Sequence, residues 1–252
     1  MAKLSAILDY LEELLQPSLF DDYGPNGLQV PGPEEVERVV TGVSAHQELF
    51  ERGTEAGADL VICHHGILWD AQPRAISPVL KARLETLFRA DMALAAYHLP
   101  LDAHPEVGNN ALICARLGLE RAEPFGRHRG REIGFVGRSS QPLALEDLVA
   151  RCREAFGQEP FVWDFGPDAV GTVGILSGGG ASSLAEAAAL GLDAFLTGEP
   201  AEPAMADARE AGIHFTAAGH YATETFGVRR LGELLQEGFG VEQRFISVPN
   251  PV

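Results

Sequence analysis

The fold is decided by GADLVICHH, residues 57–65, in which a short apolar run stands between a glycine and two histidines. A run of this length after a glycine predicts a strand, here residues 59–63. Outward from it, short β-branched or apolar runs alternate with helix-length segments of mixed polarity. This alternation is typical of parallel strands joined by crossover helices, so we expect an α/β fold.

The other expected elements follow from the same patterns. Apolar residues at helical spacing predict a helix over residues 4–15. Ser77 and Pro78 suit an N-cap and a first helical position, which predicts a helix over residues 78–89. Further helices are expected over residues 145–156, 182–190 and 222–236, and a loop over residues 21–30. Strands are expected over residues 38–43, 59–63, 92–97, 132–137, 161–163, 172–176, 193–196, 214–217 and 242–248.

The two halves of the chain resemble each other. GADLVICHH matches GLDAFLTGE at residues 191–199, VVTGVSA at residues 39–45 matches VGILSGG at residues 173–179, and AAYH at residues 95–98 matches AAGH at residues 217–220. We infer an internal duplication: two related α/β/α halves, residues 1–125 and 126–252, with mostly parallel mixed sheets. The alternative is the general similarity of all βα units.

Candidate metal ligands stand where these strands end. His64 and His65 follow one strand directly, Asp102 lies four residues after His98, and His220 and Glu224 are four residues apart at an expected helix start. Functional groups collect at the carboxyl ends of parallel strands. Neighbours in an extended chain point in opposite directions, so we expect the paired histidines to serve one ion each. Glu224 is the candidate for bridging the ions, because a carboxylate has two oxygens.

The donor set suits two divalent ions. Three imidazoles and two carboxylates leave positions open for water and substrate, and they fit Zn, Fe, Mn, Co or Ni. Structural roles are the alternatives: an ordinary helical ion pair for His220 and Glu224, and a turn or cap for Asp102. Cys63 should point into the sheet and not ligate.

His98 and Glu199 are further candidates for the site. In the repeat, His98 corresponds to His220 and Glu199 corresponds to His65. Both residues should therefore border the same crevice, where they could transfer protons, support the ligands or contact the substrate. His104 is expected to be only a loop residue.

Composition limits the partners. With 36 acidic and 19 basic residues the net charge is −17, which disfavours broad nucleic-acid binding but permits a small anionic substrate near positive charge. No apolar run approaches the ~20 residues of a membrane span, and the first residues lack a secretory pattern, so we expect a cytoplasmic protein. Three scattered cysteines indicate reduced, buried thiols.

Two further segments have open interpretations. Arg127, Arg129 and Arg131 form the only dense basic cluster, which could bind a substrate phosphate, although we favour a solvated loop before the strand at residues 132–137. SGGGASS, residues 177–183, resembles an anion-binding turn but lacks a P-loop ending. A tight turn with a capping serine explains it equally well.

Five strings carry a resemblance to one family. They are NGLQV at residues 26–30, ICHHG at 62–66, HLPLD at 98–102, LTGE at 196–199 and GHYATE at 219–224. In this order they are similar to the GTP cyclohydrolase I type 2 family, also called the NIF-three-like family. The resemblance implies a dinuclear centre in a toroidal homohexamer whose sites face an internal cavity. It implies five ligands, with Glu224 shared: His64, His65, Asp102, His220 and Glu224.

These observations predict a metal-dependent hydrolase in which an activated water attacks a nucleotide or a related small substrate. The family label implies attack at C8 of the guanine ring of GTP. One alternative is a metal-handling or protein-interaction hexamer without catalysis. Another is a phosphoesterase or nuclease acting on short oligonucleotides, which needs a basic approach surface.

Overall fold

The computed structural model describes all 252 residues and divides them into two compact units. The first unit comprises Met1–Leu101 and Gly227–Val248, and the second comprises Asp102–Phe226 and Pro249–Val252. These units differ from the expected halves 1–125 and 126–252. The reason is strand pairing: β13 (Glu242–Phe245) pairs in parallel with β4 (Arg38–Ser44), so the end of the chain belongs to the first sheet.

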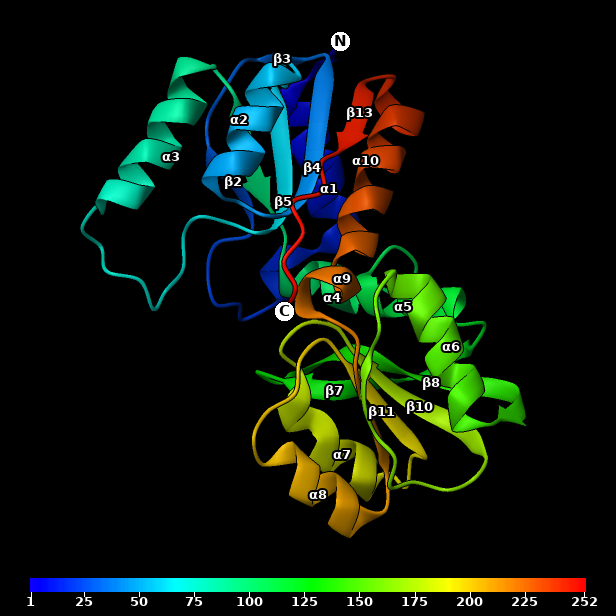
Figure 1. Ribbon diagram of the computed structural model, residues 1–252. Helices are drawn as coiled ribbons and strands as arrows, with labels where there is room; N and C mark the ends of the chain where they lie inside the picture. Colours follow the sequence, from blue (N-terminus) through cyan, green and yellow to red (C-terminus); the bar gives the residue numbers. More distant parts are fainter. The chain divides into compact units, whose positions relative to one another are not determined.

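The first unit is built on a five-stranded sheet in the order β13-β4-β5-β6-β2 (Figure 1). Its other strands are β5 (Leu60–His65), β6 (Ala93–Ala96) and β2 (Gly27–Val30). All neighbours are parallel except β2, which runs antiparallel to β6. The short strands β1 (Ala2–Lys3) and β3 (Glu35–Val36) form a separate antiparallel pair.

Helices cover both faces of this sheet. Both faces need cover because successive side chains of each strand point to opposite faces, and both sets are apolar. Gly42 of β4 packs against Leu49 of α2 (Gln47–Glu55), and Leu87 of α3 (Pro78–Arg89) joins the same core cluster. On the other face, Thr41 lies against α10 (Thr225–Phe239). α1 (Leu4–Leu15) lies beside α10, because Tyr10 meets Phe239 with ring centroids 5.6 Å apart. The remaining helical segments are η1 (Pro17–Leu19) and the first three residues of α4 (Leu99–Ala103), whose last two residues belong to the second unit.

The second unit is built on a six-stranded sheet in the order β7-β8-β10-β11-β12-β9. Its strands are β7 (Glu120–His128), β8 (Arg131–Leu143), β9 (Phe161–Trp163), β10 (Val170–Leu176), β11 (Ala194–Thr197) and β12 (His214–Ala217). β10, β11 and β12 are parallel, and the outer strands are antiparallel to their neighbours. The mixed α/β fold and two sheet-containing halves predicted from the sequence are confirmed.

Helices cover this second sheet in the same way. Residues of α5 (Asn109–Arg116) and α6 (Leu145–Phe156) share a core cluster with Val173 and Leu196 on one face. On the other face Gly174 meets Leu192, which follows α7 (Leu184–Ala189). Phe195 contacts the ring of Phe125 in a T-shaped arrangement and the ring of Phe215 at a tilt. The remaining helices are η2 (Ala181–Ser183), α8 (Ala204–Ala211) and α9 (His220–Thr223).

The strand registers support the sequence repeat and correct one part of it. Val39 pairs with Leu60 and Val173 pairs with Ala194, as the alignment of the first two segments requires. On the next strand, Leu60 pairs with Ala93 whereas Ala194 pairs with His214. Ala93 is therefore equivalent to His214, and five residues further along the chain His98 is equivalent to Gly219. The predicted match of His98 with His220 was therefore shifted by one residue.

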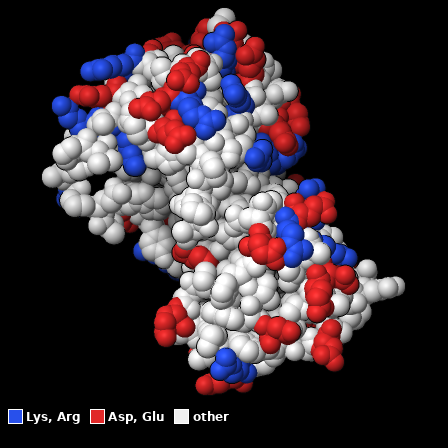
Figure 2. All heavy atoms as spheres, viewed as in Figure 1, with Lys and Arg blue, Asp and Glu red and all other residues white.

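The charged side chains on the surface and the character of the helices are as the composition predicts. Asp and Glu side chains are visible on both units in Figure 2, with Lys and Arg among them, as a net charge of −17 leads one to expect. None of the helices combines the length and the apolar character needed to cross a bilayer.

Candidate metal centre

His64 is held at the carboxyl end of β5 in a fully buried position. Its Nδ1 lies 3.1 Å from the carbonyl oxygen of Tyr97, at the end of the neighbouring strand β6. A carbonyl can only accept, so Nδ1 carries the proton and Nε2 carries the lone pair that a metal ion requires. The backbone carbonyl directly after β6 thus sets the tautomer of His64.

His65 ends the same strand and lies beside His64, with ring centroids 4.7 Å apart. Its Nδ1 lies 3.1 Å from Ser44 Oγ, at the end of β4. The expectation that the two imidazoles point in opposite directions was wrong. His64 is bonded to one neighbouring strand end and His65 to the other, and the two rings remain together on the same edge of the sheet.

His98 lies next to both histidines, with ring centroids 5.0 Å from His64 and 5.5 Å from His65. One ligand atom from each of His64, His65 and His98 falls within 4.8 Å of the others, so this group could hold a metal ion. We call these three residues the histidine cluster.

Asp22 fixes the orientation of His98. The Nδ1 atom of His98 lies 2.7 Å from Asp22 Oδ1, and the Asp22 side chain is only 3% exposed. Asp22 also accepts hydrogen bonds from Asn26 Nδ2 and from the backbone N–H groups of Tyr23 and Leu99. Burial raises the pKa of Asp22, but the hydrogen bond and charge of His98, with the bonds from Asn26 and Tyr23, outweigh it and lower the pKa from 3.8 to about 2. Asp22 is therefore ionised at neutral pH.

Asp102 is buried in the second unit and is 5% exposed. Its Oδ1 accepts hydrogen bonds from Asn109 Nδ2 at 2.9 Å and from Ser177 Oγ at 3.0 Å. Asn110 bonds the Asp102 carbonyl and accepts from the backbone N–H of Ser177. These bonds join α4, α5 and the end of β10, so the position of the carboxylate is fixed by three elements.

His220 lies between two carboxylates of the second unit. Its Nε2 is 3.2 Å from Glu224 Oε1, and its Nδ1 is 3.3 Å from Glu199 Oε1. The hydrogen bond to Glu224 raises the pKa of His220, burial lowers it, and the charges of Glu224 and Glu199 raise it further, to about 9. Glu224 is 3% exposed and lies at the break between α9 and α10, with φ −106° and ψ 7°. We call His220, Glu224 and Glu199 the carboxylate cluster.

Gly178 connects Asp102 to the carboxylate cluster. It follows Ser177, its φ is +64°, and a Cβ here would collide with Glu224 Oε1. Its N–H donates to Thr223 Oγ1 at 3.0 Å, and its carbonyl accepts from the N–H of Gly198. The SGGGASS segment is therefore a turn that packs closely against candidate ligands, and no serine in it caps the following helix.

Three other sequence features lie outside these clusters. Cys63 belongs to the core beneath α2 and α3, and burial raises the pKa of its thiol far above the usual range. The basic run is not a loop, because β7 and β8 pair through His128 and Arg131 and turn at Arg129 and Gly130. His104 accepts two backbone hydrogen bonds in its own loop.

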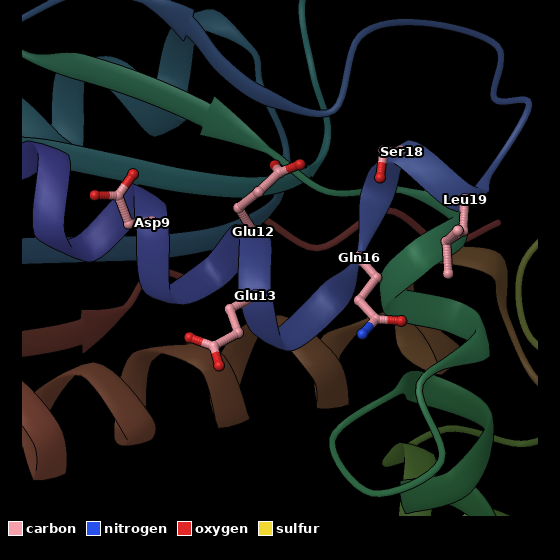
Figure 3. Close-up of a pocket in the computed structure, with 6 residues that line it drawn as sticks. All are labelled: Asp9, Glu12, Glu13, Gln16, Ser18 and Leu19. Atoms are coloured by element: carbon pink, nitrogen blue, oxygen red, sulfur yellow. The ribbon is translucent and has the colours of Figure 1, made fainter.

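A pocket of about 480 Å³ lies along α1 and η1 in the first unit. Figure 3 shows Glu12 and Glu13 at this pocket, pointing away from each other. None of the predicted ligands lines it. The lining residues are Asp9, Glu12, Glu13, Gln16, Ser18 and Leu19.

The sequence profile of the Duf34/NIF3 (NGG1p interacting factor 3) family matches residues 2–251. The chain belongs to the Duf34/NIF3 family. Two similar relatives are each named "GTP cyclohydrolase 1 type 2 homolog". The one from Pseudomonas aeruginosa is 41% identical over 98% of both chains, and the one from Escherichia coli K12 is 42% identical over 96% of both.

Solved structures of this Duf34/NIF3 fold agree with the comparison of sequences. A structure titled "Structural genomics, protein ybgI, unknown function" has a TM-score of 0.94 and 40% identity, covering 99% of this chain and all of that one. TTHA1606 from Thermus thermophilus has a TM-score of 0.90 and 35% identity over 99% of this chain and all of its own. Reduced HcgD from Methanocaldococcus jannaschii, at 23% identity and a TM-score of 0.85 over 97% of this chain and 98% of its own, shares the fold.

Sequence reasoning missed the residues that hold the candidate ligands in this Duf34/NIF3 chain. Asp22 and Asn26 stand in the expected loop, and Asn109 and Asn110 begin a helix that was not delimited. The available signal was a loop dense in Asp and Asn, and an Asn-Asn pair close after Asp102. Their partners are distant in the sequence, so the spacing did not identify them.

Proposed function

We propose that this Duf34/NIF3 chain is a hydrolase dependent on two divalent metal ions. The proposed ligands are His64, His65, Asp102, His220 and Glu224, with Glu224 shared between the ions. The supporting observation is that each unit, by itself, gathers donors at the carboxyl ends of its parallel strands: imidazoles in the first unit, two carboxylates and an imidazole in the second. Mixed N and O donors suit Zn, Fe, Mn, Co or Ni.

The burial of the carboxylates supports a cation site. Asp102 and Glu224 are 5% and 3% exposed, and buried negative charges require positive partners. Near Glu224 the proton on His220 supplies positive charge, and the hydrogen bond between the two side chains is the largest cause of the raised pKa of His220. A divalent cation would replace that proton with a larger positive charge at the same atoms.

Bound cations would supply Lewis-acid stabilisation of developing negative charge and would lower the pKa of water. His98 would then accept the proton that this water loses. With Nδ1 donating to Asp22, its lone pair is on Nε2, which can accept a proton from water and return it to the leaving group. The ionised Asp22 stabilises the imidazolium that forms and keeps the ring in this orientation.

Glu199 would act through His220. Its Oε1 accepts from His220 Nδ1 at 3.3 Å, so the Nε2 of His220 is directed toward Glu224 and the proposed ions. This is the usual arrangement of a carboxylate behind a metal-bound histidine. Of the two residues expected to move protons, we therefore assign proton transfer to His98 and orientation to Glu199.

We propose a nucleotide substrate, with opening of the guanine ring of GTP at C8 and release of formate as the first reaction to test. The names of the bacterial relatives motivate this choice. Purified protein should be freed of metal with a chelator, reloaded with each candidate metal, and assayed for formate from GTP. Formate released only by metal-loaded protein supports the proposal. Turnover of phosphoesters without formate would replace the cyclohydrolase by a phosphoesterase, and no turnover of any nucleotide with metal bound would favour a metal-handling role.

We also propose that the chain assembles as a homohexamer, as the family resemblance implies. Light scattering should give a mass about six times the 27.0 kDa of one chain. A monomer at micromolar concentration would contradict the proposed assembly and leave the ligand assignment standing.

A further inference from the structure

Two aromatic side chains stand beside the histidine cluster, and the proposed chemistry gives them no role. The ring of Trp69 lies 5.2 Å from that of His98, at 85°, and 5.8 Å from that of His65. Tyr23 lies 6.1 Å from His98 on the ring centroids. Tyr23 is 37% exposed and Trp69 is partly exposed, so both rings border His98 without being enclosed in the core.

The two segments that carry these rings are bonded to each other. The N–H of Asp70 donates to the carbonyl of Tyr23 at 2.7 Å, next to both aromatic residues. Gln29 Oε1 accepts from the N–H of Ile67 at 2.8 Å, and a Cβ at Gly24 would collide with the carbonyl of Leu68. Residues 22–30 and 66–70 therefore form one closely packed framework around the histidine cluster.

The indole of Trp69 is fixed within that framework. Its Nε1 donates to the carbonyl of Gly66 at 3.0 Å, which restrains the ring about both side-chain torsions. Trp69 is anchored at its polar edge, partly exposed, and adjacent to the histidine that we assign to proton transfer.

We propose that Trp69 is the stacking platform for a planar heteroaromatic ring of the substrate, with Tyr23 as a second aromatic wall. An immobilised indole loses little entropy when a ring stacks on it, and stacking is tolerant of the identity of the base. A ring held on Trp69 would lie next to His98. This inference rests on the proposed hydrolase, for which it names the class of substrate: a nucleobase or a similar flat heterocycle, recognised by its ring.

The chain offers a direct optical test because it has two tryptophans, Trp69 and Trp163. Trp163 packs against Phe161 and Phe215 in the second unit, so Trp163→Phe preserves an aromatic contact and leaves Trp69 as the sole indole reporter. Full-length, metal-free Trp163→Phe protein should be titrated with guanosine, with adenosine and, as a control without an aromatic ring, with ribose. We expect saturable quenching of the Trp69 emission by both nucleosides and none by ribose.

Substitution of Trp69 gives the second arm. Calorimetry should show guanosine binding weakened about 10-fold or more in Trp69→Leu, and by less than about 3-fold in Trp69→Phe, which keeps a ring. Absence of quenching at millimolar nucleoside, or equal affinity in wild type and Trp69→Leu, would overturn the platform. If Trp69→Leu does not fold, the quenching experiment decides alone, since residue 69 is unaltered there. Neither arm needs metal or turnover, so quenching together with no nucleotide hydrolysis by the metal-reloaded protein would uphold the platform and count against a nucleotide hydrolase.

Discussion

At the scale of single residues, the candidate site needs a glycine, which has no side chain, as well as the residues whose side chains could bind metal. Gly178 has φ +64° and passes so close to Glu224 that a Cβ would collide with Oε1. His220 Nε2 would lie 3.2 Å from the same added atom. A glycine is thus required at this position for two separate reasons, backbone conformation and contact with candidate ligands.

Replacing Gly178 with alanine should therefore displace Glu224 and weaken metal binding. Gly191→Ala is a matched control, because Gly191 in the same unit has φ +69° and nothing within 4 Å of an added Cβ. Both variants should lose about 1–2 kcal/mol of unfolding free energy from backbone strain, measured by urea denaturation of metal-free protein. Only Gly178→Ala should lose metal affinity by calorimetry; equal metal affinity in the two variants would remove Gly178 from the site.

Asp22 provides the prediction on pH. Its pKa is lowered from 3.8 to about 2, so its stabilising contribution is present above about pH 4 and is lost as the pH falls toward 2. The shift corresponds to about 2 kcal/mol at neutral pH. Asp22→Asn should lower the unfolding free energy by about this amount at pH 7, and by roughly half as much at pH 3.

The exposed Asp9 serves as the control for Asp22. Asp9→Asn should change the unfolding free energy by less than about 0.5 kcal/mol at every pH. If the difference in unfolding free energy between Asp22→Asn and wild type stays constant from pH 7 to pH 3, the Asp22–His98 pair does not lower the pKa of Asp22.

At the scale of elements, the start of α5 fixes the Asp102 side of the site. The fully buried Asn110 donates to the carbonyls of Asp102 and Ile133 and accepts from the N–H of Ser177. It thereby joins α4, β8 and the end of β10 through three backbone groups. Only an amide side chain can donate twice and accept once in the same plane, and glutamine is longer by one methylene.

Asn110→Ala should leave these buried backbone groups without their partner. We expect a loss of about 2–4 kcal/mol of unfolding free energy, measured by chemical denaturation. Asn250→Ala, in the exposed C-terminal segment, should change it by less than about 0.5 kcal/mol. A loss at Asn110 no larger than at Asn250 would mean that this contact does not hold the elements together.

Patterns in the sequence predicted the elements whose signals are local. The helix Leu145–Phe156 and the strand Phe161–Trp163 have the predicted bounds, and Ser77 caps Pro78–Arg89 through the N–H of Leu80 as expected. β2 and β7 were not predicted, since β2 has only four residues and β7 is charged and contains Pro124. The alignment at His98 was wrong by one residue because the segments at residues 95–98 and 217–220 share the letters AA-x-H. The pairing register of the strands gives the correct alignment, and no local sequence pattern encodes that register.

At the scale of the whole molecule, the proposed ligands come from both compact units. His64 and His65 belong to the first, and Asp102, His220 and Glu224 belong to the second. The sequence named these five by their places at strand ends and by family resemblance. It did not name Asp22, Asn110 or Trp69, because their roles depend on partners far along the chain. The central claim is that donors from both units bind the same pair of ions.

Metal stoichiometry in variants of each unit tests this claim most directly. Bound metal should be measured by plasma mass spectrometry after metal depletion, reloading and desalting. The proteins compared are wild type, His65→Ala, Glu224→Ala, the double variant of these two, and the control His128→Asn at the β7–β8 turn. We predict two ions per chain in wild type and His128→Asn, and one or none in both His65→Ala and Glu224→Ala. Two ions retained by either ligand variant, or one ion lost independently from each unit with full additivity in the double variant, would contradict a shared dinuclear centre.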